Sequence, residues 1–144
     1  MAALTEVGSV DVTHAADVVE LEVPASAAYV AVVRTATAGL AARFDLTLDR
    51  IEDLRIAIDE ACTLLIRRPA DAPPDHLSCL FTLAEGALTV DVSGPDVELP
   101  DRSAYAWAVL SALVDSLESG HEDVEGARRT WIRLTVRAGA GQWA

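Results

Sequence analysis

The chain has 144 residues, 51% of them hydrophobic and only 5% aromatic, which is enough apolar material for one domain with an aliphatic core. Its formal net charge is -12 and every basic residue is an arginine, so direct nucleic-acid binding is not expected and a partner with a basic face is favoured, although solubility alone would also explain the charge. The first seventeen residues lack the cationic start and apolar run of a signal peptide, and no later segment is apolar enough to span a bilayer, so we expect a cytoplasmic protein that contacts no membrane.

The N-terminal half is predicted to form a strand and two helices after a flexible tail at residues 1–16. Residues 18–24 alternate between apolar and polar, as a half-buried strand does, and Pro24 ends the run. Ser26 can cap a helix over 27–43, and Thr47 can cap a second helix that ends at Arg68 because a proline follows. The predicted buried stripes are Val30, Val33, Thr37, Leu40 and Ala41, then Ile51, Leu54, Ile58, Cys62 and Leu65.

The C-terminal half is predicted to contain a hairpin, a third helix and a last strand. Residues 77–83 and 88–92 alternate on either side of a Glu85-Gly86 turn. Ser103 can cap a helix whose apolar spacing continues to Leu117 and which Gly120 would end; a loop to residue 129 and a strand over 130–136 follow. This order predicts an α+β fold: a two-layer sandwich with a mixed, mostly antiparallel sheet and helices on one face. The domain would span 17–138, with a tail at 139–144.

The cysteines and histidines do not suggest a metal site. Cys62 and Cys79 lie in apolar segments and are expected to be reduced, buried thiols, although a redox pair remains an alternative. His14, His76 and His121 are too far apart for metal-ligand spacing and are expected at the surface.

One segment carries a family resemblance. Residues 29–66, and above all the run "IEDLRIAIDEACT", closely resemble the first two helices of RsbW-type anti-sigma factors, which are serine kinases of the histidine-kinase-like (GHKL) ATPase superfamily. The run "DEACTLLI" also resembles the corresponding segment of actinobacterial anti-sigma relatives. The resemblance weakens after residue 66, but the order of elements stays compatible. It implies the histidine-kinase-like ATPase fold, a sigma factor and an anti-anti-sigma (STAS-domain) protein as partners, and a homodimer.

The resemblance also locates a nucleotide site. In that family the second helix carries a Glu that acts as general base and, one turn later, an Asn that helps to hold Mg²⁺. Glu60 matches the Glu, whereas Leu64 stands at the Asn position and offers no oxygen to a metal. Two readings of Glu60 therefore stay open: a retained catalytic base, or an ordinary solvated or helix-paired carboxylate.

The other nucleotide motifs are eroded as well. Where the family has an Asp-x-Gly-x-Gly box that reads adenine, this chain has "VDVSGPDVE", in which Asp91 and Gly94 are the remaining candidates. The segment that should wrap the phosphates contains no glycine and places Tyr105 and Trp107 where small residues are needed. We expect a degenerate nucleotide site, no bound metal, and ATP with Mg²⁺ as doubtful cofactors.

Three functions are compatible with these observations. The first is an anti-sigma factor that sequesters a sigma factor and is antagonised by the STAS-domain protein. The second is an active serine kinase that phosphorylates that antagonist, and the third is a structural or dimerisation domain without a regulatory partner. For the first function, "YVAVVR" matches the helix that relatives turn to their partners, which makes Val30 and Arg34 candidate partner-binding residues. Arg34 lies off the buried stripe and is expected to be exposed.

Overall fold

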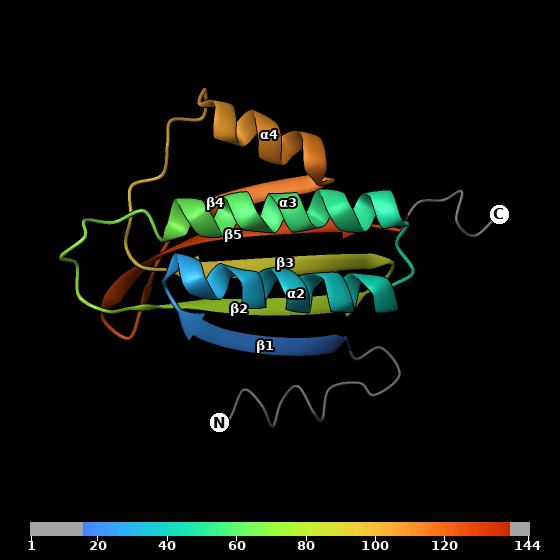
Figure 1. Cartoon of the computed structure of the whole chain (residues 1–144), viewed down its shortest axis with the longest axis horizontal. Helices are drawn as coiled ribbons and strands as arrows, with labels where there is room; N and C mark the ends of the chain where they lie inside the picture. The colour runs from blue at the N-terminus through green and yellow to red at the C-terminus, as the bar shows by residue number, and fades with distance from the viewer. Residues whose placement is uncertain (1–15, 139–144) are drawn as a thin grey trace.

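The computed structural model describes residues 16–138, which form five strands and three helices (Figure 1). In chain order these are β1 (Asp17–Pro24), α2 (Ala27–Arg43), α3 (Leu48–Leu65), β2 (His76–Ala84), β3 (Ala87–Gly94), α4 (Tyr105–Leu113), β4 (Ser116–Val124) and β5 (Ala127–Arg137). The predicted tails, 1–16 and 139–144, lie outside the described residues except for Ala16.

The first two helices begin where the sequence predicts because both predicted caps form. The Ser26 hydroxyl accepts a hydrogen bond from the Ala28 N–H at 3.3 Å, and the Thr47 hydroxyl accepts one from the Arg50 N–H at 3.2 Å. The helix α3 ends at Leu65, three residues before the predicted end.

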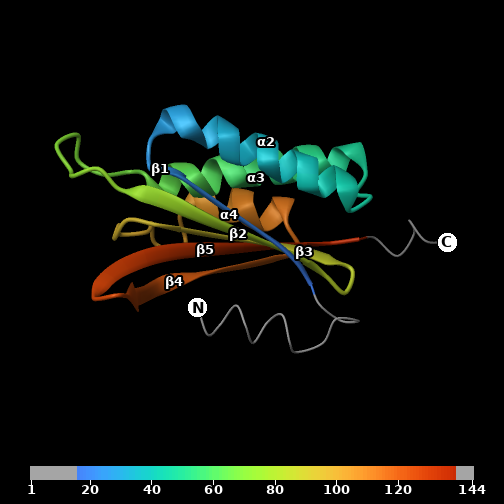
Figure 2. The same cartoon turned by 90° about the horizontal axis from the view of Figure 1, so that it is seen from below.

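The five strands form one sheet in the order β1-β2-β3-β5-β4, and all four neighbouring pairs are antiparallel. The predicted two-layer α+β arrangement is confirmed, with the helices packed on one face (Figure 2). The predicted mixed pairing is wrong for this sheet. The helix α4 leads into β4, and a hairpin then reverses the chain into β5, so the strand that pairs with β3 runs against it.

The strand β4 is the element that the sequence did not predict. The predicted third helix ran on to Gly120, but α4 ends at Leu113 and residues 116–124 pair with β5 over their whole length. The turn between them is Glu125-Gly126, with φ of 53° and 82°, which matches the Glu85-Gly86 turn and suits a two-residue hairpin. A nine-residue helix has little stability of its own, so pairing with a neighbouring strand overrides the helical spacing at Leu117.

The start of α4 also differs from the prediction. Ser103 does not cap it: the cap residue is Ala104, without a side-chain hydrogen bond, and the Ser103 hydroxyl bonds to Asp101 instead.

The core lies between the inner face of the sheet and the three helices. Alternate residues of the three central strands point into it, and the stripes of the helices close it from above. Its largest fully buried side chains are Phe81, Leu54, Ile58, Leu65, Leu77, Leu88, Leu110, Ile132 and Leu134.

Candidate functional site

Glu60 and Leu64 occupy one side of α3, a single turn apart, as the sequence predicts from their spacing. Glu60 is half-buried, whereas Leu64 is only 3% exposed and belongs to the hydrophobic core. Its neighbours Ala61 and Leu65 are fully buried. The position where the family holds a metal-binding amide is therefore part of the packing that joins α3 to the rest of the domain.

Asp91 lies on the other side of the sheet from these two residues. Along β3, Val90 and Val92 point into the core, so Asp91 points to the face that the helices leave uncovered. Its carboxylate accepts a hydrogen bond from the Arg133 Nε at 2.5 Å, and this bond raises the pKa of Arg133 above its usual value. The structure does not bring Asp91 together with Glu60.

Gly94 ends β3 in a tightly packed environment. A Cβ atom at this position would lie 2.9 Å from Leu77 Cδ2 and 3.3 Å from Leu65 Cβ. The glycine therefore allows the end of β3 to approach α3 and β2 closely, which is a packing role rather than a flexible phosphate loop.

An aromatic side chain packs against the loop that leads into α4. Trp107 is 4% exposed, its indole N–H donates to the Pro100 carbonyl at 2.9 Å, and the Arg102 guanidinium lies 4.5 Å from the ring centroid. Tyr105, in contrast, is 83% exposed and fills nothing. Trp107 thus fixes the loop before α4, which is the segment that the resemblance assigns to the phosphates.

These four regions do not fit Mg-ATP. Leu64 supplies no oxygen to a magnesium ion, Asp91 is paired on the opposite face, Gly94 is packed against side chains, and Trp107 holds the loop. Between residues 16 and 138 no group of three or more His, Cys, Asp or Glu side chains is arranged to hold a metal ion.

The helix α2 places the two candidate partner-binding residues differently from the prediction. Val30 is 7% exposed and packs in the core, so its side chain offers almost no surface to a partner. Arg34 is not freely exposed: its guanidinium forms an ion pair with Asp59 of α3 at 2.6 Å, with 31% of its side chain accessible. The apolar side chains that α2 does expose are Tyr29 and Val32, at 44% and 45%.

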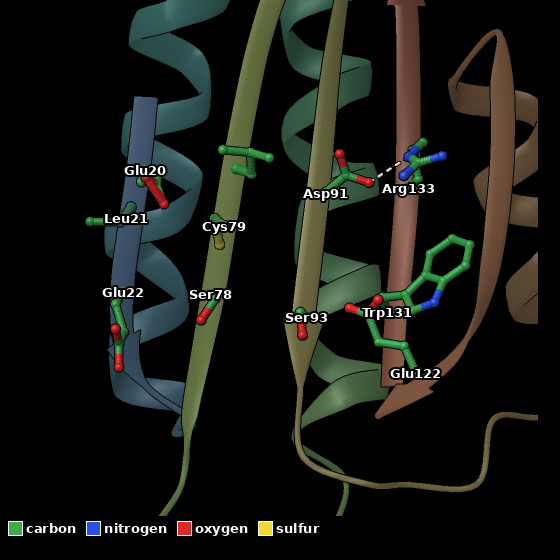
Figure 3. A pocket seen from close by; sticks show the side chains of 11 residues that line it. Glu20, Leu21, Glu22, Ser78, Cys79, Asp91, Ser93, Glu122, Trp131 and Arg133 are labelled. Atoms are coloured by element: carbon green, nitrogen blue, oxygen red, sulfur yellow. Dashed lines mark hydrogen bonds and ion pairs between the residues drawn. The ribbon is translucent and has the colours of Figure 1, made fainter. Parts of the chain in front are cut away.

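A hollow on the uncovered sheet face is the feature that the sequence analysis missed (Figure 3). It has a volume of about 540 Å³ and is lined by Glu20, Leu21, Glu22, Ser78, Cys79, Leu80, Asp91, Ser93, Glu122, Trp131 and Arg133. The alternation of apolar and polar residues along β5 does predict that Trp131 and Arg133 point outward, so the sequence indicates part of this lining. The neighbouring residues come from four other strands, however, and one of these strands was not predicted.

The cysteines and histidines have structural surroundings. Cys62 and Cys79 are free and buried, as predicted, and burial raises the pKa of both thiols, that of Cys79 to about 12. His121 is exposed and His76 half-buried beside Asp75, while His14 lies outside the described residues.

Comparison with known proteins agrees with the fold. Residues 23–136 match the family described as the histidine kinase-like ATPase domain. The chain is also similar to proteins named "Serine-protein kinase RsbW" from Bacillus thuringiensis (strain Al Hakam), Bacillus cereus (strain AH820) and Bacillus anthracis, each 28% identical over 126 residues that cover 73% of this chain and 78% of the relative. None of the described helices has the length and apolarity needed to cross a membrane. The chain therefore belongs to the histidine kinase-like ATPase domain family.

Proposed function

We propose that this protein is an anti-sigma factor that binds and sequesters a sigma factor in the cytoplasm. Its family membership and its similarity to proteins named as RsbW kinases support the proposal. In the same proposal the protein forms a homodimer and is antagonised by an anti-anti-sigma protein with a STAS domain.

The replacement of the metal-binding amide by a core leucine is the observation that carries this proposal. Leu64 is 3% exposed among other apolar side chains, where a charged phosphate and its metal would lose their hydration without compensation. A protein that keeps the family scaffold without this site acts by contact with partners rather than by phosphoryl transfer.

An active serine kinase that phosphorylates the anti-anti-sigma protein is the alternative. One observation favours it: Glu60, which matches the family's general base, is still half-exposed on α3. Titration with Mg-ATP separates the two functions. We expect no binding in the micromolar range and no phosphate transfer to a STAS-domain partner. Binding in that range would contradict the loss of the nucleotide site, and phosphate transfer would establish the kinase instead.

The exposed side of α2 is the proposed docking surface for the sigma factor. Tyr29 and Val32 supply accessible apolar area there, while Arg34 lies on the other flank of the helix, which faces α3. An arginine can grip a partner's carboxylate with two hydrogen bonds, although here it would have to share its guanidinium with Asp59.

Calorimetric titration of the chain with the host's sigma factors tests this surface. We expect Arg34→Ala to weaken binding by about 1–3 kcal/mol, as truncation of an interface arginine does. Arg43→Ala, near the end of the same helix, should leave the affinity unchanged. Asp59→Asn is the sharper control, because it removes the ion pair and keeps the arginine.

The three variants distinguish docking from helix packing. If Asp59→Asn weakens sigma binding as much as Arg34→Ala does, the arginine acts only by joining α2 to α3. Equal affinities for the wild type and all three variants would place the docking surface elsewhere, and binding to no sigma factor at all would exclude the proposed function.

A further inference from the structure

The face of the sheet opposite the helices is uncovered in the part of the chain that the structure describes (Figure 2). Strand register places outward residues in rows across it. One row runs through Glu22, Ser78, Ser93, Trp131 and Gly120, and the next through Glu20, Leu80, Asp91, Arg133 and Glu118. The hollow of about 540 Å³ lies over these rows. Its volume is within the range of ligand pockets, roughly 300–1,000 Å³, whereas a merely solvated sheet face needs no such concavity.

Carboxylates stand on opposite sides of this hollow, with Glu20 and Glu22 on β1 and Glu122 on the far side (Figure 3). Among residues 16–138, Glu20 and Glu122 form no ion pair, and Glu22 has only the imidazole of His76 nearby, at 3.6 Å. The one arginine in the lining, Arg133, is already shared between Asp91 and Glu118. The hollow therefore has an excess of negative charge that its own residues do not neutralise.

An aromatic ring also lines the hollow. The indole of Trp131 rests against Gly120, where a Cβ atom would come within 2.9 Å of its Cζ2, so the ring is held against the backbone of β4. The Arg133 guanidinium lies 5.3 Å from the ring centroid, so the ring already takes part in one cation–π contact within the hollow. Leu80, two strands away, is 37% exposed and adds apolar surface to the floor.

We propose that this open face is a second docking surface, which binds an arginine-bearing segment of a protein partner. A planar guanidinium pairs with a carboxylate through two hydrogen bonds and stacks on an aromatic ring, and the hollow offers both kinds of group side by side. A second copy that docked through the same face is a poor occupant, because it would bring the same unneutralised carboxylates against these. The surface is separate from α2, so the proposal stands whether or not the sigma factor docks on that helix.

A short synthetic peptide in which Arg and Ser alternate is the probe. Titrated at physiological ionic strength into the isotope-labelled full chain, it should shift the NMR signals of outward residues on the sheet and leave those of α2 and α3 in place. We expect Glu20→Gln combined with Glu122→Gln to raise the peptide's Kd about tenfold. Trp131→Leu should raise it about threefold, since it removes the π face and keeps an apolar side chain.

The matched control is Glu85→Gln combined with Glu98→Gln, which makes the same change in charge at exposed positions outside the hollow. It should change the Kd by less than about twofold, because salt screens the attraction between the peptide and exposed charges that it does not contact. A peptide with citrulline in place of Arg should not bind. Equal weakening by both double variants would show attraction by net charge alone and overturn the proposal. So would shifts confined to the helices, no binding, or concentration-dependent shifts on this face without peptide, which would make a second copy the occupant.

Discussion

Replacing Leu64 by asparagine restores the family's metal-binding amide at the position where this chain has a core leucine. The two side chains have similar lengths, so the substitution asks whether chemistry or packing governs the site. Because Leu64 is 3% exposed and its neighbours on α3 are fully buried, the new amide would lie among apolar groups.

The expected cost follows from that burial. Losing the buried leucine side chain removes about 1.5–3 kcal/mol of hydrophobic stabilisation. An amide without hydrogen-bond partners adds about 1–3 kcal/mol in proteins. We therefore expect Leu64→Asn to lower the free energy of unfolding by about 3–5 kcal/mol, which corresponds to a Tm lower by about 10–17 °C in a domain of this size.

Urea unfolding followed by circular dichroism measures the free energy, and calorimetric titration with Mg-ATP measures binding. Leu64→Met is the matched control: it keeps the volume and the apolar character, so its cost should stay below about 1.5 kcal/mol. A Leu64→Asn variant with unchanged Tm that binds Mg-ATP in the micromolar range would refute the reasoning, because the pocket would then be intact and closed only by this side chain.

Three further predictions concern other parts of the domain. Gly94→Ala should destabilise the domain by about 1–3 kcal/mol, because the new Cβ would lie 2.9 Å from Leu77. Gly39→Ala should instead stabilise the domain by about 0.5–1 kcal/mol, because no atom lies within 4 Å of its Cβ in α2. Chemical denaturation measures both changes. Burial alone would raise the pKa of Asp75, but hydrogen bonds from the His76 N–H and the Arg129 guanidinium lower this pKa below its usual 3.8. The ionised Asp75 therefore stabilises the fold above pH 3.8, and this stabilisation is lost as the pH falls through the lowered pKa. Melting curves recorded from neutral pH downward should therefore show a smaller fall in Tm for Asp75→Asn than for the wild type. An equal fall in Tm would exclude the Asp75 carboxylate as the source of the acid sensitivity. Finally, the buried thiols of Cys62 and Cys79 should react with a thiol reagent only upon unfolding, and rapid labelling of the native protein, detected by mass spectrometry, would contradict their burial.

Local chemistry explains what could be predicted from the sequence. The caps at Ser26 and Thr47, the Glu85-Gly86 hairpin and the spacing of Glu60 and Leu64 each involve residues within one or two turns of one another. Such features depend on backbone geometry that a short segment determines by itself. The family resemblance likewise rests on one continuous segment, and the fold that it implied is confirmed.

Contacts between distant segments were decided only by the tertiary structure. Leu117 has the spacing of a helical residue, yet β4 forms because its partner strand β5 lies beside it in the sheet. Arg34 has the position of an exposed helical residue, yet it pairs with Asp59, 25 residues away. The separation of Asp91 from Glu60 and the hollow around Trp131 depend on which face of the sheet the helices cover. Periodicity shows that a strand has two faces and a helix has a stripe, but the partner that each face meets is determined by the packing of the whole chain.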